Sequence, residues 1–379
     1  METDKGNKDN SYRDTISTVG EDGDRVWVYP KKPVGKHYDY RKLVSYGMLA
    51  FLFTGPFIKI NGEPLLMLNF IERKFVLLGQ IFWPQDFYIF LFATLTFIVF
   101  IVLFTLAFGR LFCGWVCPQT IFMEMLFRRI EYWIEGDFQH QKALDKKKGT
   151  KEYFVKKGAK HVIFFIISWH ISNTFLAYIM GGDELFRITT ENPADHVVGI
   201  VSMFIFTFIF YGVFAKMREQ VCTTICPYGR LQGALLDHDS LIVAYDYVRG
   251  EGRGKFKKNE NRPTENKGDC IDCNQCVNVC PTGIDIRNGT QLECVNCTAC
   301  IDACDFMMDK VGMNKGLVRF ASEANIAENK PYQITLKVKA YSAVLAILFV
   351  GFIALLFSRS DIDATVLRTP GLLYQTQED

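Results

Sequence analysis

Eight cysteines in the C-terminal half of this chain constrain its fold most, because their spacing is typical of an iron–sulfur domain. They form two runs with the pattern CxxCxxCxxxC: Cys270, Cys273, Cys276 and Cys280, then Cys294, Cys297, Cys300 and Cys304. Ferredoxins that bind two [4Fe–4S] clusters have this pattern, and the fourth cysteine of each run binds the other cluster. We therefore expect Cys304 to complete the first cluster and Cys280 to complete the second.

Two structural zinc sites are the main alternative interpretation of these runs, because paired CxxC elements also bind zinc. Zinc needs neither a third closely spaced cysteine nor a proline directly after the fourth, where Pro281 follows Cys280. The pattern therefore favours a domain that carries one electron at a time.

Long uncharged segments indicate a membrane protein, since apolar residues make up 49% of the chain and gather in blocks. Four blocks have about 20 residues each, enough for a helix to cross a bilayer: Phe87–Phe108, His161–Gly182, Val197–Ala215 and Ala340–Ser358. A shorter block, Leu43–Ile58, is a fifth candidate span. We predict a polytopic α-helical membrane protein with about five transmembrane helices and an inserted cytoplasmic ferredoxin-like domain with two [4Fe–4S] clusters.

The distribution of charge predicts the orientation. Lys and Arg are frequent before residue 43 and between residues 109 and 160, whereas the loop 183–195 is acidic. Basic loops stay in the cytoplasm, so the N-terminus and the ferredoxin domain are expected there. The formal net charge of +2 leaves no excess of positive charge for nucleic-acid phosphates.

These patterns divide the chain into five parts. We expect a cytoplasmic tail (1–42), a membrane domain with four helices (43–239), the ferredoxin domain with a basic linker (240–335), a fifth helix (336–358) and a short periplasmic tail (359–379). Within them, residues 60–83 are expected to form a non-spanning loop or hairpin at the outer surface, and 255–268 a solvated linker.

The remaining four cysteines form two CxxxCP motifs: Cys113 and Cys117, followed by Pro118, and Cys222 and Cys226, followed by Pro227. Each motif lies just past the cytoplasmic end of a span and precedes a helical segment, in which proline suits the first turn. After Pro118 the alternation of apolar and charged residues predicts an amphipathic helix at the membrane interface. The repeat predicts a pseudo-symmetric pair of units that closes one site at the membrane surface.

Two CxxxC pairs offer up to four thiolates, which suit a soft ion such as Cu(I). A disulfide and buried structural cysteines are alternatives. An additional iron–sulfur cluster is less favoured, because the CxxCxxC wrapping is missing. The four CxxxCP cysteines are therefore the candidate catalytic residues.

Motifs along most of the chain carry a resemblance to a known family. They are Phe82–Tyr88, Cys113–Thr120, Cys226–Gln232, Arg249–Glu251, Cys280–Arg287, Gln291–Cys294, Cys300–Cys304 and Gly316–Arg319. In their order and spacing the chain resembles the FixG/RdxA/CcoG family of membrane-bound polyferredoxins, which includes the cytochrome c oxidase accessory protein CcoG. Members of this family typically continue into a periplasmic immunoglobulin-like domain, which this sequence is expected to lack because it stops at Asp379.

The resemblance implies a location in the bacterial inner (cytoplasmic) membrane and a role in the assembly of a haem–copper cytochrome c oxidase. CcoG proteins look like cupric reductases, so the resemblance implies that electrons from a cytoplasmic donor pass through the two clusters to Cu(II). Copper would be held by Cys113, Cys117, Cys222 and Cys226. The Cu(I) product would go to copper chaperones or to a copper-transporting ATPase.

Two other functions fit the same motifs. The chain also resembles the NapH-type polyferredoxins, which implies a quinol dehydrogenase whose CxxxCP units border a quinone pocket. A non-enzymatic assembly factor or redox sensor would instead use the state of the clusters to control contact with partner proteins. The sequence leaves the oligomeric state open.

Overall fold

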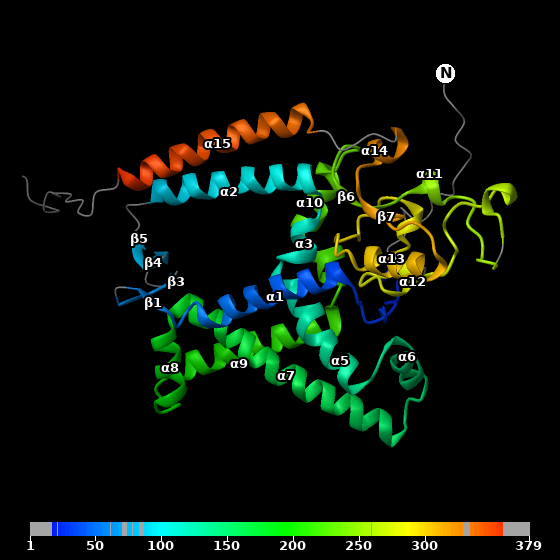
Figure 1. The fold of residues 1–379 in the computed structure, drawn as a ribbon. Helices are drawn as coiled ribbons and strands as arrows, with labels where there is room; N and C mark the ends of the chain where they lie inside the picture. Colours follow the sequence, from blue (N-terminus) through cyan, green and yellow to red (C-terminus); the bar gives the residue numbers. More distant parts are fainter. Residues whose placement is uncertain are drawn as a thin grey trace, which may run out of the picture.

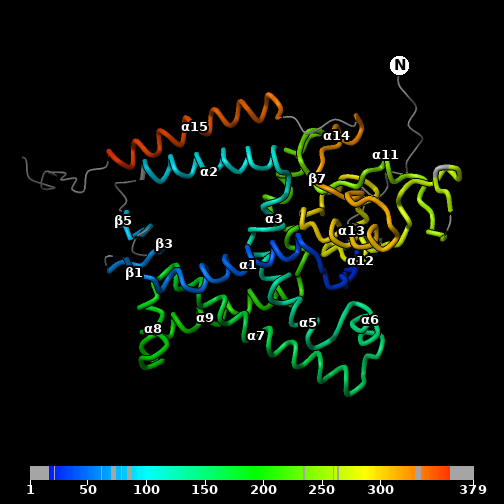
Figure 2. Tube along the Cα trace, in the orientation of Figure 1, coloured from blue at the N-terminus to red at the C-terminus, as the bar shows by residue number. Residues whose placement is uncertain are grey.

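The computed structural model describes residues 17–358, apart from 21, 61, 70–73, 78, 83–86, 259 and 329–333. Long helices form one part of the molecule, and a loop-rich region that holds both cysteine runs lies at one end of them (Figure 1). Figure 2 shows the same course along the Cα trace. The predicted tail at 359–379 lies outside the described residues.

Among the described residues, four helical segments are long and apolar enough to cross a membrane. They are Tyr88–Phe108 in α2 (Phe87–Phe108), all of α7 (Lys151–Met180), Val197–Met217 in α9 (Val197–Gly212) and η4 (Val213–Met217), and all of α15 (Leu336–Phe357). In the apolar window of α15 no described residue is buried by the protein, which suits a helix that crosses a bilayer. Helices α2 and α15 pack side by side (Figure 1).

The fifth predicted span, Leu43–Ile58, corresponds to α1 (Lys36–Thr54), which is not among the four candidate spans. Its course nevertheless follows theirs. At its start, His37 Nδ1 lies 2.8 Å from a carboxylate oxygen of Asp302 in the ferredoxin region. Near its end, Tyr178 at the far end of α7 donates a hydrogen bond to two carbonyl groups of the last turn, at 3.0 and 3.2 Å. Helix α1 therefore extends along the helical layer from one side to the other.

The side away from the ferredoxin region carries short strands and one helix. They are β1 (Lys59–Ile60), β2 (Glu63–Pro64), β3 (Leu66–Asn69), β4 (Lys74–Leu77), β5 (Gln80–Phe82) and α8 (Gly182–Thr190). Strands β3, β4 and β5 form an antiparallel sheet in which Met67 pairs with Val76. The segment predicted as a non-spanning loop or hairpin is thus a small sheet packed against α7.

The other side holds the segments that follow the spans. They are α3 (Leu111–Trp115), α4 (Pro118–Ile121), η3 (Phe122–Phe127), α5 (Arg128–Ile134), α6 (Phe138–Lys146), η5 (Val221–Ile225) and α10 (Pro227–Leu235). The α4–η3–α5 segment corresponds to the predicted amphipathic helix.

The prediction of an interfacial helix required its charged face to be exposed to solvent. In the structure this face is buried. Arg128 is 1% exposed and Glu131 is buried, whereas Trp133 is 79% exposed. Arg218, at the end of η4, donates to both carboxylate oxygens of Glu131 at 3.0 and 2.7 Å. The prediction is wrong in this respect, because oppositely charged side chains from distant segments pair with this face and offset the cost of burying it.

The ferredoxin region consists of short elements and loops. They are β6 (Ile242–Tyr245), α11 (Tyr247–Gly250), η6 (Arg262–Glu265), α12 (Gln275–Asn278), η7 (Ile286–Asn288), α13 (Ala299–Val311), β7 (Val318–Ala321) and α14 (Glu323–Glu328). Strands β6 and β7 pair antiparallel and so join the two ends of the region, with Val243 opposite Phe320.

Most described residues of the stretch 255–268, predicted as a solvated linker, are exposed, but Arg262 connects the stretch to the first cysteine run. Arg262 is buried and donates hydrogen bonds to the carbonyl groups of Gly254, Gly268 and Cys270, at 2.6 to 3.2 Å. The stretch is therefore solvated along most of its length, as predicted, and it is anchored at Arg262, whose side chain satisfies carbonyl groups that a free loop would leave to water.

Candidate functional site

The first cluster site combines cysteines from both runs. Burial, together with the neighbouring charges of Cys276, Cys273 and Cys270, raises the pKa of the Cys304 thiol to about 12. The structure therefore places Cys304, from α13, beside the first triplet. Such thiols are neutral at ordinary pH in the absence of metal, and iron would supply the positive charge that ionises them.

The second cluster site has the reciprocal composition. One internal cavity is lined by Cys276, Cys280, Cys294, Cys297 and Cys300, so Cys280 lies with the second triplet. Burial raises the pKa of Cys294 to about 12 and that of Cys297 to about 11, and the charge of Cys280 adds to both shifts. The cavity and its sulfur lining fit a [4Fe–4S] cluster.

Both triplets have the same unusual backbone. The residues on either side of the middle cysteine adopt positive φ: Asp272 and Asn274 around Cys273, with 49° and 54°, and Asn296 and Thr298 in the second loop, with 51° and 65°. Such values cost energy outside glycine, so they mark a backbone held by its surroundings. Two loops with one shape suit two clusters of one type.

The two CxxxCP motifs also share one local structure. Cys117 precedes α4 and Cys226 precedes α10, and in each case proline occupies the first helical turn. The sulfur of Cys117 accepts hydrogen bonds from the backbone N–H groups of Gln119 and Thr120, which oppose the rise of its pKa caused by burial. The two CxxxCP motifs therefore have the same local structure, a cysteine directly before a helix that begins with proline.

These two units pack against each other. Phe112, beside Cys113, lies edge-on to Tyr228 with ring centroids 6.1 Å apart. The Cys113 thiol donates to Gln232 Oε1 at 3.2 Å, and Gln232 belongs to the second unit. Burial raises the pKa of Cys222 to about 12, and the charges of Cys117, Cys113 and Cys226 contribute. The structure brings all four CxxxCP cysteines into one neighbourhood, which we call the four-cysteine centre.

The sulfurs of this centre are not gathered around a point. In the part of the chain that the structure describes, no three His, Cys, Asp or Glu side chains lie close enough to hold one metal ion. A tetrahedral ion with metal–sulfur bonds of about 2.3 Å needs sulfurs roughly 3.8 Å apart. Binding of one copper ion by all four cysteines stays a prediction, and it requires these sulfurs to move closer together.

The four-cysteine centre lies directly against the second cluster site. Cys113 belongs to the same buried apolar cluster as Val295 and Cys297. The contact leaves no space, since a Cβ atom on Gly114 would lie 2.3 Å from the carbonyl oxygen of Val295. The indole nitrogen of Trp115 donates to the carbonyl oxygen of Asn296 at 3.3 Å.

Arg110 and Gln232 join the two sites. Gln232 ends the Cys226–Gln232 motif, whereas none of the sequence motifs contains Arg110. Arg110 Nε donates to Gln232 Oε1 at 2.9 Å, and its Nη1 donates to the carbonyl group of Leu292, two residues before Cys294. Because Gln232 also accepts from Cys113, the arginine bridges the four-cysteine centre and the second cluster loop.

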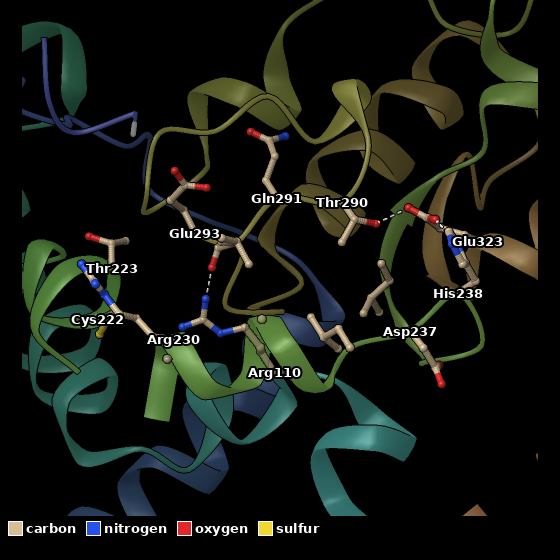
Figure 3. Close-up of a pocket in the computed structure, with 15 residues that line it drawn as sticks. Arg110, Cys222, Thr223, Arg230, Asp237, His238, Thr290, Gln291, Glu293 and Glu323 are labelled. Atoms are coloured by element: carbon tan, nitrogen blue, oxygen red, sulfur yellow. Dashed lines mark hydrogen bonds and ion pairs between the residues drawn. The ribbon is translucent and has the colours of Figure 1, made fainter. Parts of the chain in front are cut away.

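A pocket of about 780 Å³ opens beside this bridge (Figure 3). Cys222 lines one part of it and Glu293 of the second cluster loop lines another. Across the pocket, Glu323 pairs with His238 at 2.7 Å and accepts from Thr290 at 2.6 Å. The pocket therefore connects solvent with a cysteine of the four-cysteine centre.

Comparison with known proteins identifies the family. Residues 217–323 match a family described as "4Fe-4S dicluster domain", and residues 90–139 match one described as "4Fe-4S binding domain". Protein RdxB of Cereibacter sphaeroides is 34% identical to this chain, and the alignment covers 93% of this chain and 76% of RdxB. Protein RdxA of the same organism is 33% identical, and the alignment covers 94% of this chain and 77% of RdxA. The chain belongs to the FixG/RdxA family.

The nitrogen fixation protein FixG of Rhizobium meliloti is 36% identical over 312 residues, which are 80% of this chain and 58% of FixG. The chain is shorter than these FixG/RdxA relatives. No solved structure matches it. The predicted family and the helical fold class with [4Fe–4S] domains are confirmed, and the protein is an iron–sulfur membrane protein of electron transport.

Proposed function

We propose that this FixG/RdxA-family protein reduces Cu(II) to Cu(I) at the cytoplasmic face of a bacterial inner membrane, for the assembly of a haem–copper cytochrome c oxidase. One observation carries the proposal: the four-cysteine centre touches the second cluster site through Cys113 and faces a solvent-connected pocket through Cys222. The electron-transfer path from the ferredoxin region to a thiol-lined site that copper can reach is therefore short.

The chemistry is a one-electron transfer. The [4Fe–4S] clusters supply single electrons when bound, and each Cu(II) takes up one of them to become Cu(I). Thiol sulfur is a soft ligand that favours Cu(I) over Cu(II), so cysteines near the acceptor make the reduction more favourable. Copper is a substrate in this proposal, not a resident metal.

The chain's own residues hold the two sites together. Gly114 allows the CxxxCP turn to reach the second cluster loop, and Arg110 bridges the two through hydrogen bonds. Water is excluded from the contact because Cys113, Val295 and Cys297 are buried. These features give a close contact, without water, between the second cluster site and the four-cysteine centre.

The proposal includes the orientation and the partners. The basic residues 142–160 lie on the same side as the ferredoxin region, and basic loops favour the cytoplasm. A cytoplasmic one-electron donor would reduce the clusters, and copper chaperones or a copper-transporting ATPase would receive Cu(I). The bilayer is the remaining partner, and no nucleic acid is involved.

The test is anaerobic reduction of copper by the purified protein. The clusters are reduced and the excess reductant removed, Cu(II) is added, and cluster reoxidation is followed while a chromogenic chelator traps Cu(I). We expect one Cu(I) per electron released. Serine at Cys113, Cys117, Cys222 and Cys226 should abolish this reaction and leave the ferredoxin cluster signals in place, whereas the matched variant T223S/T224S should react normally. Equal copper reduction in the four-serine variant would remove the four-cysteine centre from the proposal.

The pocket beside Cys222 also supports a second candidate, a quinol dehydrogenase. Its volume of about 780 Å³ lies in the range of small-molecule sites, roughly 300–1,000 Å³. Leu236 and Ile242 supply apolar surface there and Arg110 a polar group. Reduction of the clusters by a short-chain quinol, without a response to copper, would favour this function over copper reduction.

A further inference from the structure

The four-cysteine centre has the donors and the surroundings of a resident cluster site. We infer that Cys113, Cys117, Cys222 and Cys226 bind a third iron–sulfur cluster at the membrane surface, in addition to the two clusters of the ferredoxin region. The two motifs contribute two ligands each, and the donor set is the same four thiolates that a ferredoxin cluster uses.

The number of ligands is the first argument. The match to a "4Fe-4S binding domain" covers residues 90–139, which contain Cys113 and Cys117 but neither ferredoxin run. Two cysteines are half of what a cluster with four thiolate ligands requires. The fold supplies the other half, because the hydrogen bond from Cys113 to Gln232 and the contact of Phe112 with Tyr228 place the second motif beside the first.

The spacing of the sulfurs is the second argument. The two motifs are neighbours, because Cys113 donates to Gln232 and Phe112 contacts Tyr228, yet no three of their cysteines approach closely enough for one ion. The described cysteines of the ferredoxin region are arranged in the same way: they share one buried cluster or line one cavity, and no group of three suits a single ion. A cluster places several atoms between its ligands and spreads them apart. The four-cysteine centre therefore resembles the cluster sites of its own chain more than a single-ion site.

Unused polar groups beside the cysteines are the third argument. Gln232 is fully buried, and its Nε2 amide group has no hydrogen-bond partner. The hydroxyl of the buried Thr120 has none either, and it lines a cavity together with Cys222. Leaving such donors unpaired costs energy, and the sulfur atoms of a cluster are acceptors that would use them. The guanidinium group of Arg110 brings positive charge beside the thiolates, because its Nε donates at 2.9 Å to the same Gln232 oxygen that accepts from Cys113.

The position of the centre is consistent with one-electron transfer. Cys113 packs in one apolar cluster with Cys297 of the second cluster site. A cluster there would take up one electron from the ferredoxin region and release one at the pocket by Cys222, so the electrons balance at each step. The inference rests on the proposed function only in assigning the four-cysteine centre to the electron path, and it does not need copper as the acceptor.

The test is the metal content of the full chain, purified without oxygen and loaded with iron and sulfide. Three [4Fe–4S] clusters contain about 12 iron atoms per chain and two contain about 8. We expect about 12, with as much acid-labile sulfide, and a loss of about 4 iron atoms in the four-serine variant. Electron paramagnetic resonance of the reduced variant should lack one component and retain those of the ferredoxin clusters, and T223S/T224S should match the parent protein.

The outcomes separate this inference from the copper proposal. A parent count of about 10 iron atoms that falls to about 8 in the variant identifies a two-iron cluster and supports the inference. A parent count of about 8 overturns it whether or not the variant folds, and the copper proposal still stands if Cu(I) forms. Loss of iron in the variant with unchanged copper reduction supports the third cluster and removes the centre from copper chemistry.

Discussion

The ferredoxin region and the four-cysteine centre both gather cysteines, but they do so by different means. The ferredoxin cysteines lie between residues 270 and 304, and their loops are shaped locally by positive φ at positions such as Asn274 and Thr298. The CxxxCP motifs are more than 100 residues apart, and the packing of the chain between them brings them together. Local chain geometry determines the first kind of site, whereas tertiary contacts determine the second.

The largest expected effect tests the crossed ligand pattern of the ferredoxin region. Cys304→Ser should remove the same spectroscopic component, and the same iron, as Cys270→Ser, because both residues lie in the first site. Cys280→Ser should instead match Cys294→Ser. Iron analysis and electron paramagnetic resonance of the four variants make the comparison. If Cys304→Ser matched Cys294→Ser, each run would hold its own cluster.

The next largest effect tests the buried ion pairs that Arg128 forms with Glu124 and Glu219. Arg128 is buried, contacts Glu124 and Glu219, and donates to the carbonyl group of Pro281 at 2.8 Å. Arg128→Met leaves buried carboxylates without this partner, so the free energy of unfolding should fall by about 3–5 kcal/mol. Thermal unfolding in detergent measures the change.

An exposed ion pair provides the control for this variant. Lys156 pairs with Glu152 on the surface of α7, where water and salt screen the interaction. Lys156→Met should leave the unfolding temperature unchanged. Equal unfolding temperatures for Arg128→Met and its parent would show that the buried ion pairs do not hold the two regions together.

A smaller effect tests the contact between the two regions. Gly114→Ala places a methyl group 2.3 Å from the carbonyl oxygen of Val295, so the CxxxCP turn must move away. Overpacking of this kind costs about 1–3 kcal/mol, and electron transfer to the four-cysteine centre should slow as the contact opens. Gly158→Ala in α7 is the control, since its Cβ would meet no atom within 4 Å. An unchanged rate of cluster reoxidation in Gly114→Ala would rule out this contact as the path.

The smallest effect is a pH dependence within the ferredoxin region. Burial alone would raise the pKa of Asp285, but hydrogen bonds from Arg287 lower it below its ordinary 3.8. A carboxyl group with a lowered pKa stabilises the fold above 3.8, and this contribution disappears as the pH falls through the folded-state pKa. At neutral pH Asp285→Asn should cost about 1 kcal/mol, since the group is partly exposed to solvent.

Unfolding of the parent and of Asp285→Asn by denaturant, from neutral pH down to about pH 3, measures this dependence. The difference between the two proteins should shrink as the pH falls. A constant difference across the range would mean that the charge of Asp285 does not stabilise the region.

The sequence predicted the spans with the strongest apolar character and missed features that depend on distant partners. The long apolar segments are visible because a bilayer needs many consecutive apolar residues. The burial of Glu131 was not visible, because its partner Arg218 lies 87 positions away and follows another helix. The anchoring of the predicted linker by Arg262 was not visible either, because it depends on carbonyl groups that carry no sequence signal.

The sequence alone determined the family, four membrane helices and a region with [4Fe–4S] clusters, because these depend on patterns along short pieces of chain. Only the tertiary structure decided that the CxxxCP motifs meet each other and touch the second cluster site. Arg110 and Gln232, which connect these sites, became visible only there. Arg110 lies in no motif, and the motif that ends at Gln232 does not show what Gln232 bonds to. The role of each side chain depends on which distant groups the fold places within hydrogen-bonding distance.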